Sequence, residues 1–119
     1  MTDNILVVKF GGGAGLDIDA CARDLAAVAR TRPVVVVHGV SAALDALCRE
    51  RGVEVQTLVS PSGHSSRYTD SQTRDLFVEA AGSVGQQWVD ALARNGIIAQ
   101  VTEPCVSGQR KDAVRAVVD

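Results

Sequence analysis

Aromatic residues are scarce in this sequence. They make up 3% of its 119 residues, and only three cysteines and three prolines are present. Valine and alanine supply much of the 46% apolar content instead. A core of small and β-branched side chains is typical of alternating strands and helices rather than of an aromatic-rich β-sandwich. The odd number and wide spacing of the cysteines argue against a disulfide framework and indicate buried thiols in a reducing compartment.

The sequence also lacks a strong excess of one charge and a long apolar run. A formal net charge of −2 provides no positive field that would hold a phosphate backbone, so we expect no nucleic-acid partner. Apolar runs such as 33–37 are far too short to cross a bilayer, and no charged-then-apolar leader opens the chain. We therefore expect a cytoplasmic protein without a membrane partner, of a length that suits one compact domain.

The first half of the chain alternates strand and helix patterns. Residues 5–10 are apolar apart from Lys9, and residues 34–37 are all valine, which predicts two strands of a sheet that is covered on both faces. The glycine-rich stretch 11–15 is too flexible for either element and predicts a loop. Helical spacing starts after Asp17 and again after Ser41, and both residues are predicted N-caps. This order predicts parallel strands joined by a crossover helix.

The second half begins with alternating residues at 53–59. A Pro-Ser-Gly turn follows, and residues 64–68 return, which predicts a hairpin at the edge of the sheet. Thr69 and Gln72 match a capping box for a helix that ends near residue 81. Further patterns predict a helix at 84–95, a strand at 97–102 and the start of a strand within 110–118. The expected fold is therefore α/β, with three α/β/α layers and a mainly parallel sheet plus an edge hairpin.

Two loops leave the carboxyl ends of the predicted parallel strands, where such sheets bind their ligands. Exposed amides in a glycine loop beside a helix N-terminus form a cradle for an anion, and Lys9 is close enough in sequence to add a positive charge. A P-loop is excluded because its lysine follows the glycines, and the dinucleotide fingerprint is excluded because Leu16 replaces its last glycine. A tight turn beside a solvent-facing lysine explains the same residues without a ligand.

Other constellations of reactive residues are weak. Ser41 lies in a segment that approaches a nucleophile elbow but lacks its closing glycine. His38 and His64 have no ligand spacing with the cysteines, so we expect no metal site.

Three motifs occur in one order: Lys-Phe-Gly-Gly at 9–12, His-Gly-Val-Ser at 38–41 and Ser-Arg-Tyr-Thr-Asp at 66–70. On these motifs the chain resembles the amino-acid kinases of the acetylglutamate kinase group, and most closely the carrier-protein-linked α-aminoadipate kinases of bacterial lysine biosynthesis. The resemblance covers essentially all 119 residues. It implies that residues 1–119 are a partial kinase domain, namely the substrate-binding half without the nucleotide-binding half.

The resemblance implies transfer of the γ-phosphoryl group of ATP, with Mg²⁺, to the side-chain carboxylate of an N-blocked acidic amino acid. That substrate would be of the aminoadipate or glutamate type, as in lysine or arginine biosynthesis. Lys9 would neutralise the phosphoryl group, and Arg67, which we expect to be exposed on the hairpin, would hold the α-carboxylate as a bidentate fork. Ser41 would contact the substrate. Close backbone approach to the phosphoryl group would come from Gly11, Gly12 and Gly39.

The implied partners are the acidic amino acid, free or linked to an acidic carrier protein, and a second copy of the chain in a homodimer. Val40 departs from the family pattern, because it replaces a second loop glycine and its β-branched side chain resists a positive φ. Gly85 replaces an asparagine that contacts the substrate, and Glu103-Pro104-Cys105 replaces a glycine-serine-glycine segment. Because the resemblance covers only the substrate-binding half, we expect the isolated chain to bind ATP and Mg²⁺ poorly and to show no ATP turnover. A non-catalytic binding or regulatory half-domain and a truncated gene fragment remain alternative interpretations.

Overall fold

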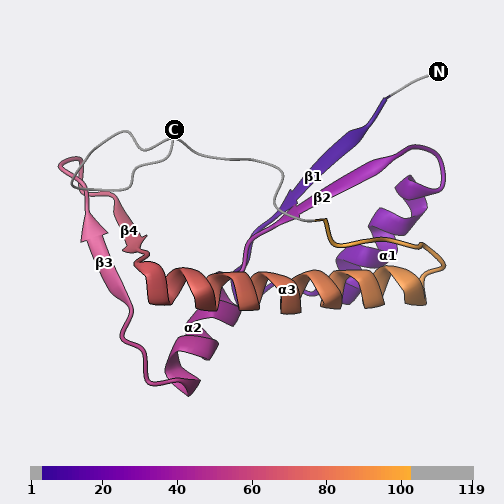
Figure 1. Ribbon diagram of the computed structural model, residues 1–119. Helices are drawn as coiled ribbons and strands as arrows, with labels where there is room; N and C mark the ends of the chain where they lie inside the picture. The colour runs from indigo at the N-terminus through magenta and orange to yellow at the C-terminus, as the bar shows by residue number, and fades with distance from the viewer. Residues whose placement is uncertain (1–3, 103–119) are drawn as a thin grey trace.

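The computed structural model describes residues 4–102 of the 119-residue chain (Figure 1). Strands and helices alternate along it, which confirms the predicted α/β class. The elements in chain order are β1 (Leu6–Phe10), α1 (Ile18–Ala29), β2 (Val34–His38), α2 (Ser41–Glu50), β3 (Gln56–Val59), β4 (Ser65–Tyr68) and α3 (Ser71–Arg94).

Strands β1 and β2 form a parallel pair, as predicted. Their register runs from Leu6 opposite Val34 to Phe10 opposite His38. Helix α1 is the crossover, and its predicted N-cap is confirmed because the Asp17 carboxylate accepts a hydrogen bond from the Ala20 amide at 3.0 Å. Both strands therefore end on the same side of the sheet, where each continues into a glycine-containing loop.

Exposure alternates along both strands of this pair. Side chains that include Val8, Phe10 and Val36 pack against the helical core. The opposite face, here called the open sheet face, carries Ile5, Val7, Val35 and Val37, which are between 47% and 64% exposed. Residues 4–102 therefore place helices on one face of the sheet, and the second helical layer of the expected three-layer arrangement is not among them.

Helix α2 is not capped by Ser41, which corrects that prediction. Ser41 is the first helical residue, and the preceding Val40 has no side-chain cap bond. The carbonyl of Gly12 accepts a hydrogen bond from the Ala42 amide instead, at 2.8 Å. A neighbouring loop therefore satisfies a first-turn donor that a capping side chain usually takes.

The predicted hairpin is present, but it forms a two-stranded sheet of its own rather than extending the β1–β2 pair. Its antiparallel register places Thr57 opposite Arg67 and Val59 opposite Ser65. Strand β3 starts at Gln56, later than expected. The turn contains Gly63 at φ +86°, a conformation that glycine adopts without steric cost.

Helix α3 is a single helix of 24 residues where the sequence predicted two. Its buried stripe includes Leu76, Val84 and Trp88 and continues through the predicted break. A glycine in a helix interior costs about 1 kcal/mol relative to alanine, and this long apolar stripe outweighs that cost at Gly82. Asp70 is the N-cap in place of Thr69 and accepts from the Thr73 amide at 2.8 Å. That hydrogen bond lowers the pKa of the Asp70 carboxyl.

The predicted strand at 97–102 is absent, and the segment has no regular structure. It leaves α3 after Gly96, whose φ of +80° ends the helix as expected. Ile97 and Ala99 pack against the helical core, so their side chains are satisfied without pairing to β2. The predicted start of a strand within 110–118 lies outside the described residues.

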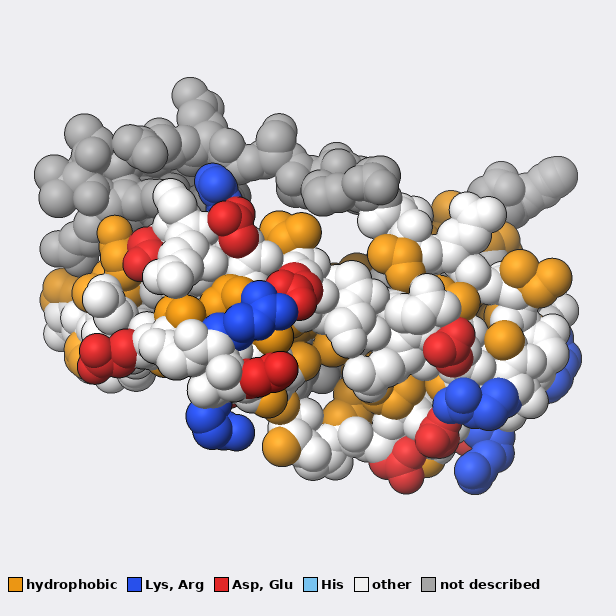
Figure 2. Space-filling model, turned by 60° about the horizontal axis from the view of Figure 1, so that its bottom comes forward, with side chains coloured by type: hydrophobic (Ala, Val, Ile, Leu, Met, Phe, Trp, Pro, Cys, Tyr) orange, Lys and Arg blue, Asp and Glu red, His pale blue; other side chains and the backbone are white. Residues whose placement is uncertain are grey.

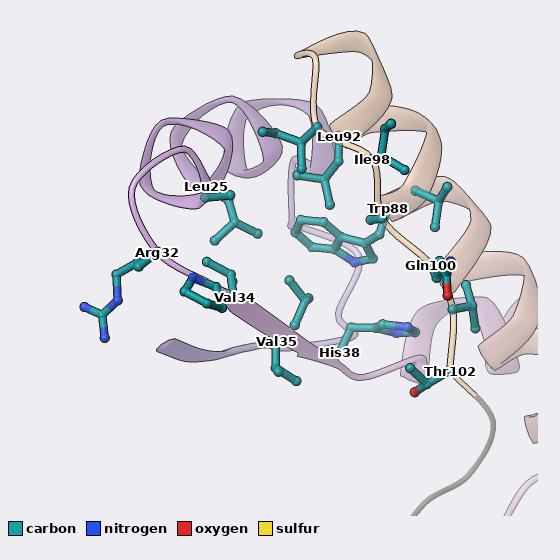
Figure 3. Close-up of a pocket in the computed structure, with 18 residues that line it drawn as sticks. Leu25, Arg32, Val34, Val35, His38, Trp88, Leu92, Ile98, Gln100 and Thr102 are labelled. Carbon is teal, nitrogen blue, oxygen red and sulfur yellow. The ribbon is translucent and has the colours of Figure 1, made fainter. Parts of the chain in front are cut away.

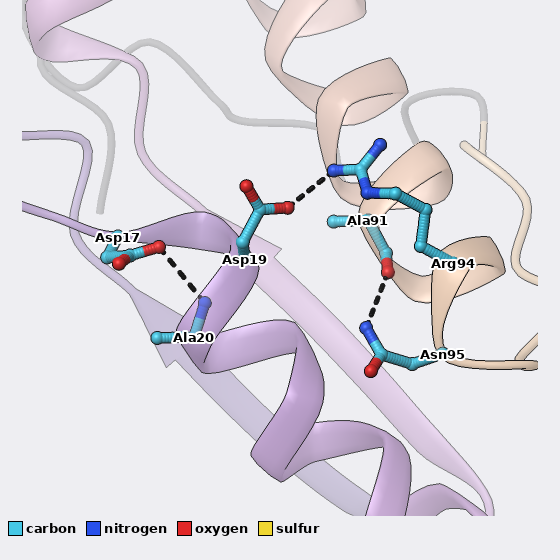
Figure 4. A network of polar contacts seen from close by, with 6 residues as sticks. All are labelled: Asp17, Asp19, Ala20, Ala91, Arg94 and Asn95. Atoms are coloured by element: carbon cyan, nitrogen blue, oxygen red, sulfur yellow. Dashed lines mark hydrogen bonds and ion pairs between the residues drawn. The ribbon is translucent and has the colours of Figure 1, made fainter.

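The core lies between the three helices and the covered face of the β1–β2 pair. Leu44 and Cys48 of α2 are its largest fully buried side chains, and the rings of Phe10 and Trp88 meet at 4.5 Å between centroids. At the rim, Asp19 pairs with Arg94 and joins α1 to α3 (Figure 4). No helix within residues 4–102 combines the length and apolarity needed to cross a membrane.

Candidate functional site: two glycine loops and a paired arginine

The loops after β1 and β2 touch backbone to backbone. A Cβ atom on Gly12 would lie 2.2 Å from the Val40 nitrogen and 2.3 Å from the Gly39 carbonyl carbon. A Cβ atom on Gly39 would in turn lie 2.7 Å from the Gly12 nitrogen. Real Cβ atoms do not approach backbone this closely, so both positions need glycine for the loops to meet.

Hydrogen bonds fix this contact. The Gly39 amide donates to the Phe10 carbonyl at 2.9 Å, and the Ala42 amide donates to the Gly12 carbonyl at 2.8 Å. The amides of Gly11, Gly12 and Gly13 donate no hydrogen bond to any residue that the structure describes. These free donors lie beside the N-terminus of α2, in an arrangement suited to an anion.

Lys9 is the residue before the last of β1, two positions ahead of Gly11. Its side chain is exposed and forms no salt bridge within residues 4–102. By the alternation of the strand it lies on the open sheet face rather than toward the helices. An ammonium group on that face carries an unpaired positive charge close to the glycine loop.

Val40 was expected to be strained, and the structure corrects that expectation. Its φ is −138°, so the position does not need a glycine conformation. Its side chain is 4% exposed and belongs to the core cluster with Leu44. Replacement of a second loop glycine by valine is therefore compatible with this backbone.

Arg67 was expected on the hairpin surface, but its side chain is only 23% exposed. It crosses from β4 to α2, where its Nη2 donates to Oδ1 of Asp45. The buried Nε of Arg67 has no acceptor among the described residues. Asp45 lies four residues after Ser41, one turn along the same face of α2. The guanidinium group is therefore held within about one helical turn of the end of α2 that the glycine loops touch.

Asp45 was missed by the sequence reasoning. Its only signal was its position one turn into a helix that follows a candidate ligand loop. Nothing in the sequence pattern indicated that Arg67, which is 22 residues further along the chain, pairs with it.

A cavity of about 480 Å³ lies beside β2, between that strand, α3 and the segment 97–102 (Figure 3). Its lining is mostly apolar, and none of the predicted site residues contributes to it. His38 and Trp88 both project toward it, and the buried Nε1 of Trp88 has no acceptor within residues 4–102. A Cβ atom on Gly85 would lie 3.0 Å from a methyl group of Val101, so the asparagine expected there would have to displace Val101.

Metal-binding and electrostatic features are limited in the described part of the chain. Residues 4–102 contain no group of three His, Cys, Asp or Glu side chains that could hold a metal ion. Figure 2 shows acidic and basic side chains interspersed on the face in view, without one large patch of either sign. Cys48 is buried, as predicted for a structural thiol, and Cys105 lies outside the described residues.

Comparison with known proteins supplies the family. The model of the amino acid kinase family matches residues 4–115, which is most of the chain. The chain belongs to the amino acid kinase family. This result agrees with the three motifs and with the alternating strands and helices of the structure.

Individual curated relatives show which members of the family the chain is similar to. The chain is 33% identical to a [LysW]-aminoadipate kinase of Deinococcus radiodurans, over 96% of this chain and 41% of that protein. It is 30% identical to a [LysW]-aminoadipate kinase of Thermus thermophilus, over 95% of this chain and 44% of that protein. A protein of Pyrococcus abyssi, named as a putative [LysW]-aminoadipate/[LysW]-glutamate kinase, is 36% identical over 71% of this chain and 36% of its own length. The chain therefore spans less than half the length of these relatives.

Proposed function

We propose that this chain is the substrate-binding part of a kinase that transfers the γ-phosphoryl group of ATP to a side-chain carboxylate. The acceptor is an acidic amino acid with a blocked α-amine, of the aminoadipate or glutamate type. The observation that carries the proposal is the contact of Gly12 with Gly39, which brings a loop with free amides to the N-terminal end of α2, one turn from Asp45, the partner of Arg67.

Each site residue has a role in this proposal. The free amides of Gly11 and Gly12 contact the phosphoryl oxygens, and the Gly12–Gly39 contact sets their direction. Lys9 neutralises the charge that the phosphoryl group carries during transfer, because it has no other counter-ion within the described residues. Arg67 holds the α-carboxylate, and Ser41, exposed at the start of α2, contacts the substrate next to it.

The described residues fit the phosphoryl end of ATP but do not fit Mg²⁺. The free glycine amides suit a phosphoryl group, which supports contact with that end of ATP. Residues 4–102 offer no carboxylate cluster for Mg²⁺, so the proposal gives them no part in holding that ion. We expect the isolated chain to form no acyl phosphate with ATP.

Two of the relatives are kinases named for [LysW]-aminoadipate, which supports an acidic amino acid linked to a carrier as the substrate. We extend the proposal to such a carrier-linked substrate and to a cytoplasmic, homodimeric protein. A second candidate function is binding of the acidic amino acid without chemistry. Gly85 favours it, because the chain has no side chain at the position of the substrate-contacting asparagine and Val101 packs closely there instead.

Carboxylate binding by the chain itself tests the proposal. Titration calorimetry with N-acetylglutamate should show binding by the wild type. Arg67→Lys should weaken it about tenfold, because lysine keeps the charge but loses the fork, whose charge-assisted bonds contribute about 1.5–3 kcal/mol. Inorganic phosphate should shift the amide resonances of the glycine loops, and less so in Lys9→Ala. Equal affinities of wild type and Arg67→Lys would contradict the assigned role of Arg67.

A further inference from the structure

The β3–β4 hairpin is almost entirely exposed. Every residue of β3 is exposed, and Arg67 is the one residue of β4 that is not. Within residues 4–102, one side-chain contact joins the hairpin to the rest of the structure by a salt bridge or hydrogen bond. This contact is the Arg67–Asp45 pair. This pair therefore connects the hairpin to the body of the molecule at α2.

The pair leaves the guanidinium group of Arg67 incompletely satisfied. Nη2 donates to Asp45, but the neighbouring Nε is buried and has no acceptor in the described part of the chain. A carboxylate that bound bidentately to this edge of the guanidinium would use both nitrogens. Asp45 thus occupies one half of a two-pronged site for a carboxylate, and the other half is unfilled.

Asp45 is also the more exposed partner. Its side chain is 46% exposed, compared with 23% for Arg67. Asp45 is nearly half exposed, so water can replace its partner at a small cost in free energy. Arg67 is more buried, so leaving its guanidinium group without an acceptor costs more free energy. Release of Asp45 from Arg67 is therefore costly when nothing replaces it, and costs little when the carboxylate of a ligand takes its place.

We propose that Asp45 competes with the α-carboxylate of the substrate for Arg67 and thereby sets the affinity and selectivity of this subsite. The proposal rests on the carboxylate-binding role of Arg67 given above. Asp45 satisfies the guanidinium group in the free protein, and a ligand carboxylate that reaches both Nη2 and Nε displaces it. A ligand without an α-carboxylate offers no replacement and leaves the Arg67–Asp45 pair intact.

A purely structural role for Asp45 makes the opposite prediction. If Asp45 only held the hairpin against α2, its loss would release Arg67 and weaken ligand binding. If Asp45 competes, its loss removes the competitor and strengthens binding. The sign of the affinity change therefore separates the two roles.

The experiment compares three proteins by titration calorimetry: wild type, Asp45→Asn and Glu79→Gln. Asparagine keeps an acceptor for Nη2 but removes the charge. Glu79 pairs with Arg51 between α2 and α3 and is 51% exposed, so Glu79→Gln matches the charge change at a similar surface pair away from Arg67. The probes are N-acetylglutamate and 4-acetamidobutyrate, which has the same side-chain carboxylate and acetamide but no α-carboxylate.

We expect Asp45→Asn to bind N-acetylglutamate with an affinity about fivefold higher than wild type, since an exposed competing ion pair is lost. Its affinity for 4-acetamidobutyrate should not change, and Glu79→Gln should behave as wild type with both probes. Amide hydrogen exchange of β4 in the free proteins checks that the hairpin of Asp45→Asn is still formed. Asp45→Ala serves as a second variant with the same expected direction.

Different failures have different meanings. Equal or weaker binding of N-acetylglutamate by both Asp45 variants, with binding still dependent on Arg67, would overturn the competition and leave the proposed function standing. A similar gain in affinity for 4-acetamidobutyrate would also overturn it, because the effect would then not depend on the α-carboxylate. Binding that does not depend on Arg67, or no binding by wild type, would overturn the proposed function and this inference together.

Discussion

Substitution of Gly12 by alanine tests the contact on which the candidate site depends. The added Cβ atom would lie 2.2–2.6 Å from three backbone atoms, in Val40, Gly39 and Ser41. Backbone cannot move aside like the end of a flexible side chain. The steric clash is removed only if the two loops separate, which breaks the 2.8 Å hydrogen bond from the Ala42 amide to the Gly12 carbonyl. Overpacking of this kind costs about 1–3 kcal/mol, and the backbone contacts place Gly12→Ala near the upper end.

Gly13→Ala is the matched control in the same loop. A Cβ atom there meets nothing within 4 Å, and Gly13 is not among the glycines with positive φ. Alanine at such a position restricts the unfolded chain and stabilises a protein by about 0.4–1 kcal/mol. The two variants carry the same chemical change one residue apart, and we expect effects of opposite sign.

Urea denaturation measures both effects, with far-ultraviolet circular dichroism for the helices and the fluorescence of Trp88, the single tryptophan, for the core. With a slope of about 1–3 kcal/mol per molar urea, the midpoint of Gly12→Ala should fall by about 1–2 M. The midpoint of Gly13→Ala should rise slightly. Equal midpoints for the two variants would refute the close contact of the loops.

Two further predictions concern capping and association. The pKa of the Asp70 carboxyl is lower in the folded protein than in the unfolded chain. The charged cap therefore stabilises the protein fully at pH values above the unfolded pKa, and this stabilisation is lost as the pH falls through the folded pKa. Asp70→Ala should therefore melt below wild type at pH 7 but not at the acid end of a melting series. The open sheet face should associate with a second copy at micromolar concentration, and Val35→Lys should reduce that association in sedimentation velocity. A monomer for wild type would contradict this second prediction.

Several features that depend on neighbouring residues alone were predicted correctly from the sequence, although the N-caps of α2 and α3 were each placed one residue away. Asp17 caps α1 because its carboxylate reaches an amide three residues on, and Gly96 ends α3 because its backbone needs a positive φ. The parallel pairing of β1 and β2 follows from two apolar runs on either side of a helical pattern.

Features that depend on distant contacts were not predictable in this way. The predicted break near Gly82 ignored the packing of α3 against both α1 and α2, which holds one long helix together. The segment 97–102 has a strand-like composition, but only its residues Ile97 and Ala99 pack against the core, and it forms no strand beside β2. Whether such a segment pairs with a neighbouring strand is decided by that strand and not by its own residues.

The same distinction holds for the candidate site. Lys9 and the loop glycines were identified as candidates from motifs, because their positions follow from where the parallel strands end. The Arg67–Asp45 pair joins a hairpin to a helix across 22 residues and has no periodic signal. The burial of Arg67 follows from that pair, so the expectation of an exposed arginine failed for the same reason.

The glycines of the first loop divide into two classes, and this division gives the last prediction. Packing alone explains why residue 12 is a glycine, because any side chain there would collide with the second loop. Packing within residues 4–102 does not explain Gly11 or Gly13, because both have open space around them, neither has a positive φ, and their amides donate to no acceptor in that part of the chain. Their lack of a side chain keeps the approach to these amides clear, which benefits a bound anion and not the fold.

Gly13→Ala should therefore retain the stability of wild type while weakening the binding of inorganic phosphate, since the methyl group enters the space that the anion would use. The loss of phosphate affinity is measured by titrations that follow the amide resonances of Gly11 and Gly12. Gly52→Ala is not a suitable control, because the φ of +67° at Gly52 would strain any side chain. Gly15→Ala is the better control, because that glycine also has open space and lies further from the contact between the loops. Phosphate affinity that is unchanged in Gly13→Ala would mean that the free amides of this loop do not form the phosphoryl site.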